Sequence, residues 1–422
     1  MIDIFYYILN FTIILVWAVI LYKRSDDVPL KKFFAPALLL KWVAGIGLGL
    51  LYLYYYKGGD TFSFYNASLK LTQVARLDFS SYLRFMLGFG AEVISDMPYA
   101  YQPRALFVVK ILSFLNLLTH NSYWLASLYF SMFSFSGLWA LGNALSVLKI
   151  RRSAIVISLL LFPSLVFWSS GVIKESLAVG ALGFLSASFI QYFIAGKRLS
   201  LVAIVDVLML LILWKVKYYY AGMFLLVTIA GLGTFLLSCR YQKAGRWGML
   251  LGLYLIISLF GFMLVSVLHP NFYLHRILGV IVDNYHAFIS ISHPGDAITY
   301  KGIEPSLTGI LPHVPKALWN GLYAPLPWYG PELFKVIAGI ENVILILLTV
   351  GALAGLRRGL SSKKRILLIC VIAYCIGLAI FLALSAPNYG TLVRYKVGFL
   401  PFLLILITTN NPLLEKLNRL VK

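Results

Sequence analysis

The chain has 422 residues, of which 61% are hydrophobic and only 12% are charged. A soluble domain carries about 25% charged residues, so this composition excludes an ordinary soluble globular protein. The formal net charge of +21 would suit a nucleic acid. Most basic residues, however, stand in short clusters between apolar runs, where they fix membrane topology and contact anionic headgroups. We therefore expect an integral membrane protein whose partner is lipid and not nucleic acid.

Apolar runs long enough to cross a bilayer recur along the whole chain. They predict an all-α, polytopic bundle of about eleven transmembrane spans in a single membrane domain, 1–422. The first run has no basic segment before it and no small-residue cleavage site, so we expect a retained helix and not a signal peptide. The predicted spans are roughly 3–22, 33–56, 122–147, 154–170, 176–195, 199–214, 221–238, 247–267, 333–355, 366–386 and 395–410.

Six short basic clusters predict the cytoplasmic side of this bundle. They lie at 23–32, 149–152, 197–198, 240–246, 357–365 and 416–422. Eleven spans place the N-terminus outside and the C-terminus inside. A further apolar stretch, 105–118, would reverse the side of the second cluster if it crossed the membrane. We therefore interpret it as an interfacial or re-entrant helix.

Two long loops are predicted on the outer side, at about 57–121 and 268–332. The other outer connections are tight turns near 169–175, 215–220 and 386–395. Lys and Arg residues also gather at this side, against the usual bias of positive charge toward the cytoplasm. Polar groups concentrated at one membrane surface are typical of a functional site. The excess positive charge predicts an anionic ligand there.

The first long loop opens with Gly58-Gly59-Asp60 and continues through Tyr65. The glycines free the backbone where the preceding span ends. Asp60 has two compatible interpretations. It is an N-cap for the next helix, or it is a carboxylate that acts as general base on a hydroxyl or binds a divalent cation.

Downstream in the same loop, aromatic residues between Asp78 and Asp96 predict a helix lying in the membrane interface. Their common face would carry Tyr82, Phe85, Met86 and Phe89. Further polar candidates of this loop are Glu92, Asp96 and Arg104.

The tight outer turns add basic candidates. Lys174 opposes the dipole of the helix it begins, which predicts an ion pair or a bound anion, whereas Glu175 suits that dipole. Lys215 and Lys217 stand beside three tyrosines of an aromatic belt, and Arg394 and Lys396 begin the final span. Arginine contacts a phosphate through two parallel hydrogen bonds, although snorkelling toward headgroups explains such residues equally well.

No metal motif is evident. The histidines of the second long loop are spaced too irregularly for a compact metal site, and three cysteines provide no disulfide framework. Two acids within predicted spans, Asp206 and Glu341, are expected to face the bundle interior and to pair with a neighbour.

The order of these features resembles the GT-C superfamily of polytopic glycosyltransferases. The segment Gly58-Gly59-Asp60, with Tyr65 and Ala67, is similar to the short acidic motif near the start of that family's first outer loop. The span at 3–22 would be extra. The resemblance implies polyprenyl-phosphate sugars as donors, no nucleotide cofactor and a site on the outer face. The Arg394-Tyr395-Lys396 turn also resembles phosphate-binding elements of polysaccharide polymerases and O-antigen ligases.

The resulting hypothesis is sugar transfer from a polyprenyl-phosphate donor to a glycan or lipid acceptor at the cell inner (plasma) membrane. Asp60 would be the catalytic base. Substrate-binding residues would be Lys174, Lys215, Lys217, Arg394, Lys396, Arg104 and Tyr65. No second Asp stands beside Asp60, so a divalent cation stays open and no other cofactor is expected. The alternatives are a repeat-unit polymerase or ligase, a lipid-linked oligosaccharide flippase or other transporter, and a membrane scaffold.

Overall fold

The computed structural model of the chain describes residues 2–89, 97–194, 196, 202–240, 246–355 and 361–415. Regular structure within these ranges is helical, apart from an isolated bridge between Ala297 and Asn388. The prediction of an all-α protein is therefore confirmed.

Eight helices of the described chain are long and apolar enough to cross a bilayer. Because these segments recur through the chain, the protein is a multi-pass membrane protein. The eight candidate spans are Ile4–Lys23, Phe34–Tyr55, Tyr123–Val147, Lys174–Phe193, Ala203–Arg240, Trp247–Ser266, Leu333–Ala354 and Ser362–Ser385.

Eight candidates do not confirm the predicted number of about eleven, and the difference arises at three places. The expected span 154–170 is broken into α8 (Arg152–Ile155), a π-helical turn (Val156–Leu161) and α9 (Pro163–Trp168). The expected spans 199–214 and 221–238 lie in α11 (Val202–Arg240), which consists of two helices joined at a kink at Lys217 and is counted as one candidate. The expected span 395–410 is two helical segments that meet at a bend of 71°.

The chain forms two compact units, each discontinuous in sequence. Unit 1 comprises residues 1–147, 160–189 and 199–218, and unit 2 comprises 148–159, 190–198 and 219–422. The helices of unit 1 besides α9 and the first part of α11 are α1 (Ile2–Lys23), α2 (Val28–Lys31), α3 (Phe34–Leu50), α4 (Asp60–Leu77), α5 (Phe79–Leu87), α6 (Pro103–Thr119), α7 (Tyr123–Val147) and the greater part of α10 (Lys174–Phe193).

Small residues bring α7 and α10 of unit 1 close together. A methyl group on Gly137 of α7 would lie 2.0 Å from the carbonyl oxygen of Gly180 on α10. Close backbone approach at small residues is how membrane helices gain packing energy, since lipid already solvates larger apolar side chains. Much of α7 is buried, which makes this pair the packed centre of unit 1.

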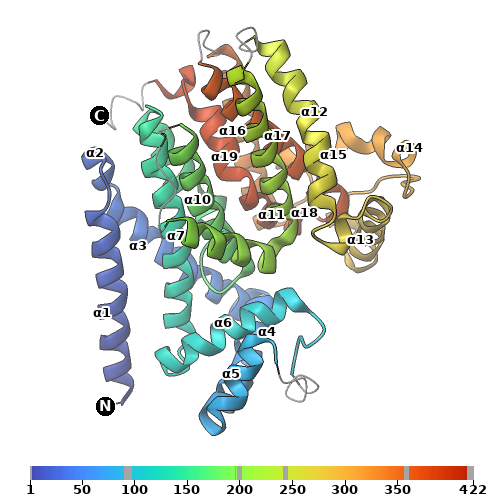
Figure 1. Cartoon of the computed structure of the whole chain (residues 1–422). Helices are drawn as coiled ribbons and strands as arrows, with labels where there is room; N and C mark the ends of the chain where they lie inside the picture. Colours follow the sequence, from blue (N-terminus) through green and yellow to red (C-terminus); the bar gives the residue numbers. More distant parts are fainter. Residues whose placement is uncertain are drawn as a thin grey trace. The chain divides into compact units, whose positions relative to one another are not determined.

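Three helices of the first long loop, α4, α5 and α6, pack against one another within unit 1 (Figure 1). A helix, α5, is present where the sequence predicts one from 78 onward. Its predicted face is partly wrong, because Tyr82 and Phe85 are buried against the unit. Phe79, Leu83 and Leu87 instead form its exposed apolar stripe. Glu92 and Asp96 lie outside the described residues.

The apolar stretch expected at 105–118 is the helix α6. Its 17 residues are not among the candidate spans, so the count of spans does not include it. Asn116 and Ser113 on this helix bond to α4, where Asn116 donates to the hydroxyl of Ser68 and Ser113 accepts through its carbonyl from Thr72. These buried hydrogen bonds fix α6 along α4.

Unit 2 holds α8, the second part of α11 and all later helices. These are α12 (Trp247–Ser266), α13 (Ile277–Ile291), α14 (Leu307–Ile310), α15 (Val314–Tyr323), α16 (Leu333–Ala354), α17 (Ser362–Ser385), α18 (Tyr389–Tyr395) and α19 (Leu400–Thr408). The second long loop contains α13, α14 and α15, of which α13 and α15 pack on α17.

Candidate functional site

Asp60 begins α4 immediately after a glycine turn. Gly59, and not Asp60, is the N-cap residue, and its φ of 109° is a conformation that residues with a Cβ rarely adopt. Asp60 therefore lies in the first helical turn, where the helix dipole favours a negative charge. Its side chain is half-buried. The prediction that Asp60 is the N-cap is therefore wrong by one residue, since Gly59 occupies that position. The glycine turn before Asp60 fixes where its carboxylate lies.

Lys174 begins α10 and lies close to the start of α4. Its ammonium nitrogen is 4.7 Å from the ring centre of Phe64, which is one helical turn after Asp60 on α4. Residues four apart share a helix face. The Asp60 and Glu175 carboxylates attract the Lys174 ammonium, while Lys217 and Arg104 repel it. Four predicted site residues therefore interact electrostatically, with Glu175 as a fifth member of the cluster. The four are Asp60, Lys174, Lys217 and Arg104.

The turn before Lys174 is held by buried polar contacts. Lys41 on α3 donates to the carbonyl oxygen of Val166 at 3.4 Å and to the hydroxyl of Ser169 at 2.5 Å. The Gly171 N–H donates to the Ser131 hydroxyl at 2.9 Å. Burying a polar group without a hydrogen-bond partner destabilises the folded protein. These contacts therefore favour a single conformation of the turn that precedes Lys174.

Lys217 differs from its prediction as a phosphate ligand. It is the non-helical residue inside α11, and its ammonium lies 2.9 Å from the Glu175 carboxylate. Both side chains are almost fully buried, at 3% and 0% exposure. Breaking a buried pair is costly because one charge is then left uncompensated. We therefore assign Lys217 to the support of the cluster and leave Lys174 and Arg104 at its surface.

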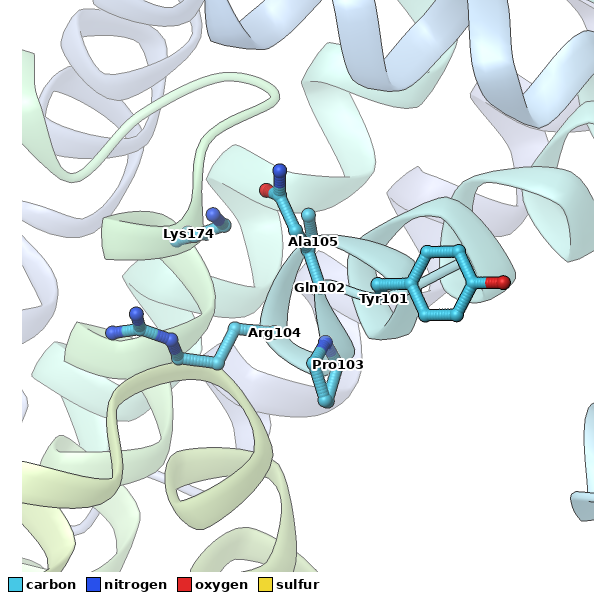
Figure 2. A pocket seen from close by; sticks show the side chains of 6 residues that line it. All are labelled: Tyr101, Gln102, Pro103, Arg104, Ala105 and Lys174. Atoms are coloured by element: carbon cyan, nitrogen blue, oxygen red, sulfur yellow. The ribbon is translucent and has the colours of Figure 1, made fainter. Parts of the chain in front are cut away.

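A cavity of about 240 Å³ opens beside Lys174 at the start of α6. The Lys174 and Arg104 side chains lie on the same side of the start of α6, whereas the Tyr101 ring points away from them (Figure 2). The guanidinium of Arg104 also lies 5.5 Å from the ring centre of Tyr218. The residues that line the cavity are Tyr101, Gln102, Pro103, Arg104, Ala105 and Lys174. Two cations therefore face a space of the size of a small ligand.

Lys215 and Lys110 extend the positive charge of unit 1. Lys215 is exposed, whereas Lys110 is half-buried and donates to the carbonyl oxygen of Phe85 at 2.5 Å. Burial and then repulsion by Lys215 lower the pKa of Lys110. Lys110 was not a candidate in the sequence, because it stands inside an apolar run and resembles a snorkelling residue.

Tyr65 was predicted to bind substrate. Its hydroxyl donates to the carbonyl oxygen of Asn121, and its ring packs edge-on against Tyr123 at 5.4 Å between centres. Burial raises the pKa of Tyr65. These contacts join α4 to the turn before α7, which gives Tyr65 a structural role independent of any ligand.

The last two predicted residues belong to unit 2. The Lys396 ammonium is buried and donates to the carbonyl oxygens of Leu322 and Ala324 and to Asn342 Oδ1, at 3.2, 2.6 and 3.1 Å. An ammonium has three donors, so protein acceptors already account for all of them. Arg394 is half-buried, with its guanidinium carbon 6.0 Å from the Tyr395 ring centre.

Unit 2 contains an ion-pair cluster around Lys335 that the sequence did not indicate. The Lys335 ammonium lies 2.8 Å from Asp296 and 2.9 Å from Glu332, and it also donates to the carbonyl oxygen of Gly295. Charge alone did not reveal it, because Lys335 follows Glu332 by one helical turn and resembles an ordinary surface pair.

In the described parts of the chain, no three His, Cys, Asp or Glu side chains could together hold a metal ion.

Comparison with known proteins adds no family to this geometry. No protein-family model, no curated protein and no solved structure matches the chain. The function must therefore be argued from the site. Lys174 and Arg104 line the cavity, and Asp60 interacts electrostatically with Lys174 from the first turn of α4. A carboxylate can deprotonate a hydroxyl, and cations can stabilise an anionic leaving group.

Proposed function

We propose that the protein is a membrane glycosyltransferase of the GT-C type, which transfers a sugar from a polyprenyl-phosphate donor to a glycan or lipid acceptor. We place the reaction at the outer face of the cell inner (plasma) membrane. The observation that carries the proposal is the position of Lys174. It lies over Phe64, one turn from Asp60, and lines the cavity together with Arg104.

The reaction is a single displacement at the anomeric carbon. The acceptor oxygen bonds to that carbon while its proton passes to the Asp60 carboxylate. The bond from the carbon to the phosphate oxygen breaks, and its electron pair stays on the phosphate. Lys174 and Arg104 stabilise this developing charge. Attack opposite the leaving group inverts the configuration of the transferred sugar.

The apolar surroundings suit a lipid-linked donor. Multi-pass helices place the cavity-bearing unit in a bilayer, where a polyprenyl chain is dissolved and reaches the site sideways. The phosphate then needs cations at the membrane boundary. Lys217 pairs with Glu175 in the first turn of α10 and so stabilises that turn. The charge of Lys174 is then available to a ligand.

The test is turnover by the purified protein in lipid nanodiscs with defined polyprenyl-phosphate and polyprenyl-pyrophosphate sugars. Asp60→Asn should lower turnover by about 10²–10⁴-fold, the usual contribution of a general base. The matched control is Asp78→Asn. Asp78 is an exposed carboxylate that caps α5, and asparagine caps equally well.

Wild-type turnover in Asp60→Asn would remove Asp60 from the mechanism. Movement of the lipid-linked sugar across the bilayer without formation of a new glycosidic bond would replace transfer with transport. Unchanged elution and unfolding temperature would show that the variant is folded.

A further inference from the structure

The second candidate span has an irregular last turn, shortly before the glycines that precede Asp60. Here α3 continues into a π-helical turn, Leu51–Tyr55, and the Tyr56 N–H donates to the carbonyl oxygen of Leu51, five residues earlier, at 3.1 Å. Single π-helical turns are rare and occur frequently at functional sites. The Tyr52 side chain in this turn is buried, at 8% exposure. A locally altered helix therefore holds a buried aromatic ring at the end of the span.

Tyr52 contacts the glycine turn before Asp60 through both its backbone and its ring. Its carbonyl oxygen accepts from the Gly58 N–H at 3.0 Å. Its ring lies against Gly59, where an added methyl group would be 2.9 Å from the ring Cε1 atom. So close a contact leaves no room for a side chain on the glycine, because protein interiors are densely packed. The start of α4, which carries Asp60, therefore follows the position of the Tyr52 ring.

Tyr52 is also connected to the turn that precedes Lys174. It forms one buried apolar cluster with Leu48 and Ile173, which we call the Tyr52 cluster, and Ile173 is the residue immediately before Lys174. Leu48, one helical turn before Tyr52, lies against the same turn, since a methyl group on Gly171 would be 3.1 Å from Leu48 Cδ2. Continuous apolar packing thus joins the two turns through the end of the second span.

The first turn of α4 is held by α7 as well. The Thr61 and Tyr123 hydroxyls share a hydrogen bond of 2.7 Å, and the Phe62 ring stacks on the Tyr123 ring at 4.5 Å between centres. Phe62 also packs against the Tyr52 cluster. These contacts fix the rotation of α4 about its axis and join its first turn to the cluster.

We propose that Tyr52 is a positioning residue, which sets the separation between the Asp60 carboxylate and the Lys174 ammonium. This inference rests on the proposed function. Transfer requires the base and the cation to hold the acceptor and the donor in one geometry, and a displacement of about 1 Å can lower a rate about 10²-fold. A smaller side chain in place of Tyr52 lets the two turns move independently, while both charged groups remain present.

The first test separates the rate of transfer from the binding of the donor, in the nanodisc turnover assay with defined polyprenyl-phosphate sugars. Tyr52→Leu should lower kcat by roughly ten- to hundredfold, because the alignment of the reacting groups is lost. KM for the donor should change much less, since Lys174 and Arg104 are still present to attract the phosphate. Tyr52→Phe keeps the ring and should keep most of kcat.

Tyr129→Leu is the matched control, because it shortens another buried tyrosine of unit 1. Tyr129 is 7% exposed and belongs to a different apolar cluster, formed with Ile14, Leu125 and Leu128. Both truncations should lower the unfolding temperature, since each leaves a cavity, but only Tyr52→Leu should lower kcat. Equal losses of kcat in the two variants would overturn the positioning role.

Cross-linking tests the same geometry without turnover. Asp60→Cys and Lys174→Cys are combined with Cys239→Ser, which removes an exposed thiol, whereas the other two cysteines are buried. A short bis-maleimide should join the two introduced thiols, and mass spectrometry of the linked peptides measures the rate. Addition of Tyr52→Leu should lower that rate roughly threefold or more, because it lowers the effective concentration of one thiol at the other. Addition of Tyr129→Leu should leave the rate unchanged.

The two experiments distinguish failure of this inference from failure of the proposed function. Absence of turnover by the wild-type protein with every donor would contradict the glycosyltransferase, whereas a cross-link that depends on Tyr52 would still show that its ring spaces the two turns. Equal cross-linking rates with and without Tyr52→Leu would overturn the positioning role, even where sugar transfer is observed. Failure to form the cross-link with Tyr52 present would also overturn it, because the two turns would then not be adjacent.

Discussion

Lys174 in unit 1 and Lys396 in unit 2 look alike in the sequence, because each is a lysine in a turn expected on the outer side. Their surroundings differ. The Lys174 ammonium lies over an aromatic ring and lines a cavity. The Lys396 ammonium donates to three protein oxygens. Lysine has three donors, so the number already used by the protein separates a structural lysine from one that faces a ligand.

Lys217 extends the comparison, because unit 1 also contains a structural lysine. Its charge is balanced by Glu175, whereas Lys396 is held by backbone carbonyls and by Asn342, with Glu341 as an electrostatic neighbour. Both are buried. Burial therefore distinguishes these two lysines from Lys174. Four predictions about stability and binding test this comparison.

The largest effect is expected for the buried pair. Glu175→Gln leaves the Lys217 ammonium without its carboxylate and should lower the free energy of unfolding by about 3–5 kcal/mol. Replacing both partners, by Glu175→Leu with Lys217→Met, should recover most of that loss, because two apolar side chains need no compensation. Thermal unfolding in detergent micelles measures both. A double variant less stable than the single one would contradict the pairing.

A smaller loss is expected when the unit 2 lysine is removed. Lys396→Met deletes three charge-assisted hydrogen bonds, two of them to buried oxygens, and should lower the free energy of unfolding by about 2 kcal/mol. Lys174→Met is the matched variant and should lower it by less than about 1 kcal/mol, since it leaves no buried carbonyl unpaired. Equal losses in the two variants would break the distinction between these lysines.

Binding should follow the opposite order. Lys174→Met removes one cation from the phosphate and should weaken binding of a prenyl phosphate about tenfold, equivalent to about 1.4 kcal/mol. In Lys396→Met the affinity of the folded protein should be unchanged. Isothermal titration in nanodiscs measures both affinities. Stronger dependence on Lys396 than on Lys174 would move the phosphate site to unit 2.

The smallest effect concerns Tyr65. Tyr65→Phe deletes its hydrogen bond to the Asn121 carbonyl and should lower the free energy of unfolding by about 1 kcal/mol. Prenyl phosphate affinity should stay at the wild-type value. Weaker binding in a variant of unchanged stability would restore Tyr65 as a substrate ligand.

Several features of the fold were predicted correctly from local sequence. Apolar runs of sufficient length predicted the helices at α1, α7, α12, α16 and α17. The Gly58-Gly59 pair indicated where α4 begins. The break at 154–170 was not predicted, because hydropathy measures the length of an apolar run and contains no information on its bends.

The sequence by itself determined that this protein is helical and crosses a membrane several times, since both follow from the apolar length of segments. It also identified Asp60, Lys174 and Arg104 as candidates by residue type. Only the tertiary structure decided which cations face a cavity. That choice depends on acceptors such as Glu175 and the Leu322 and Ala324 carbonyls. They are brought to each lysine by packing between segments far apart in the chain.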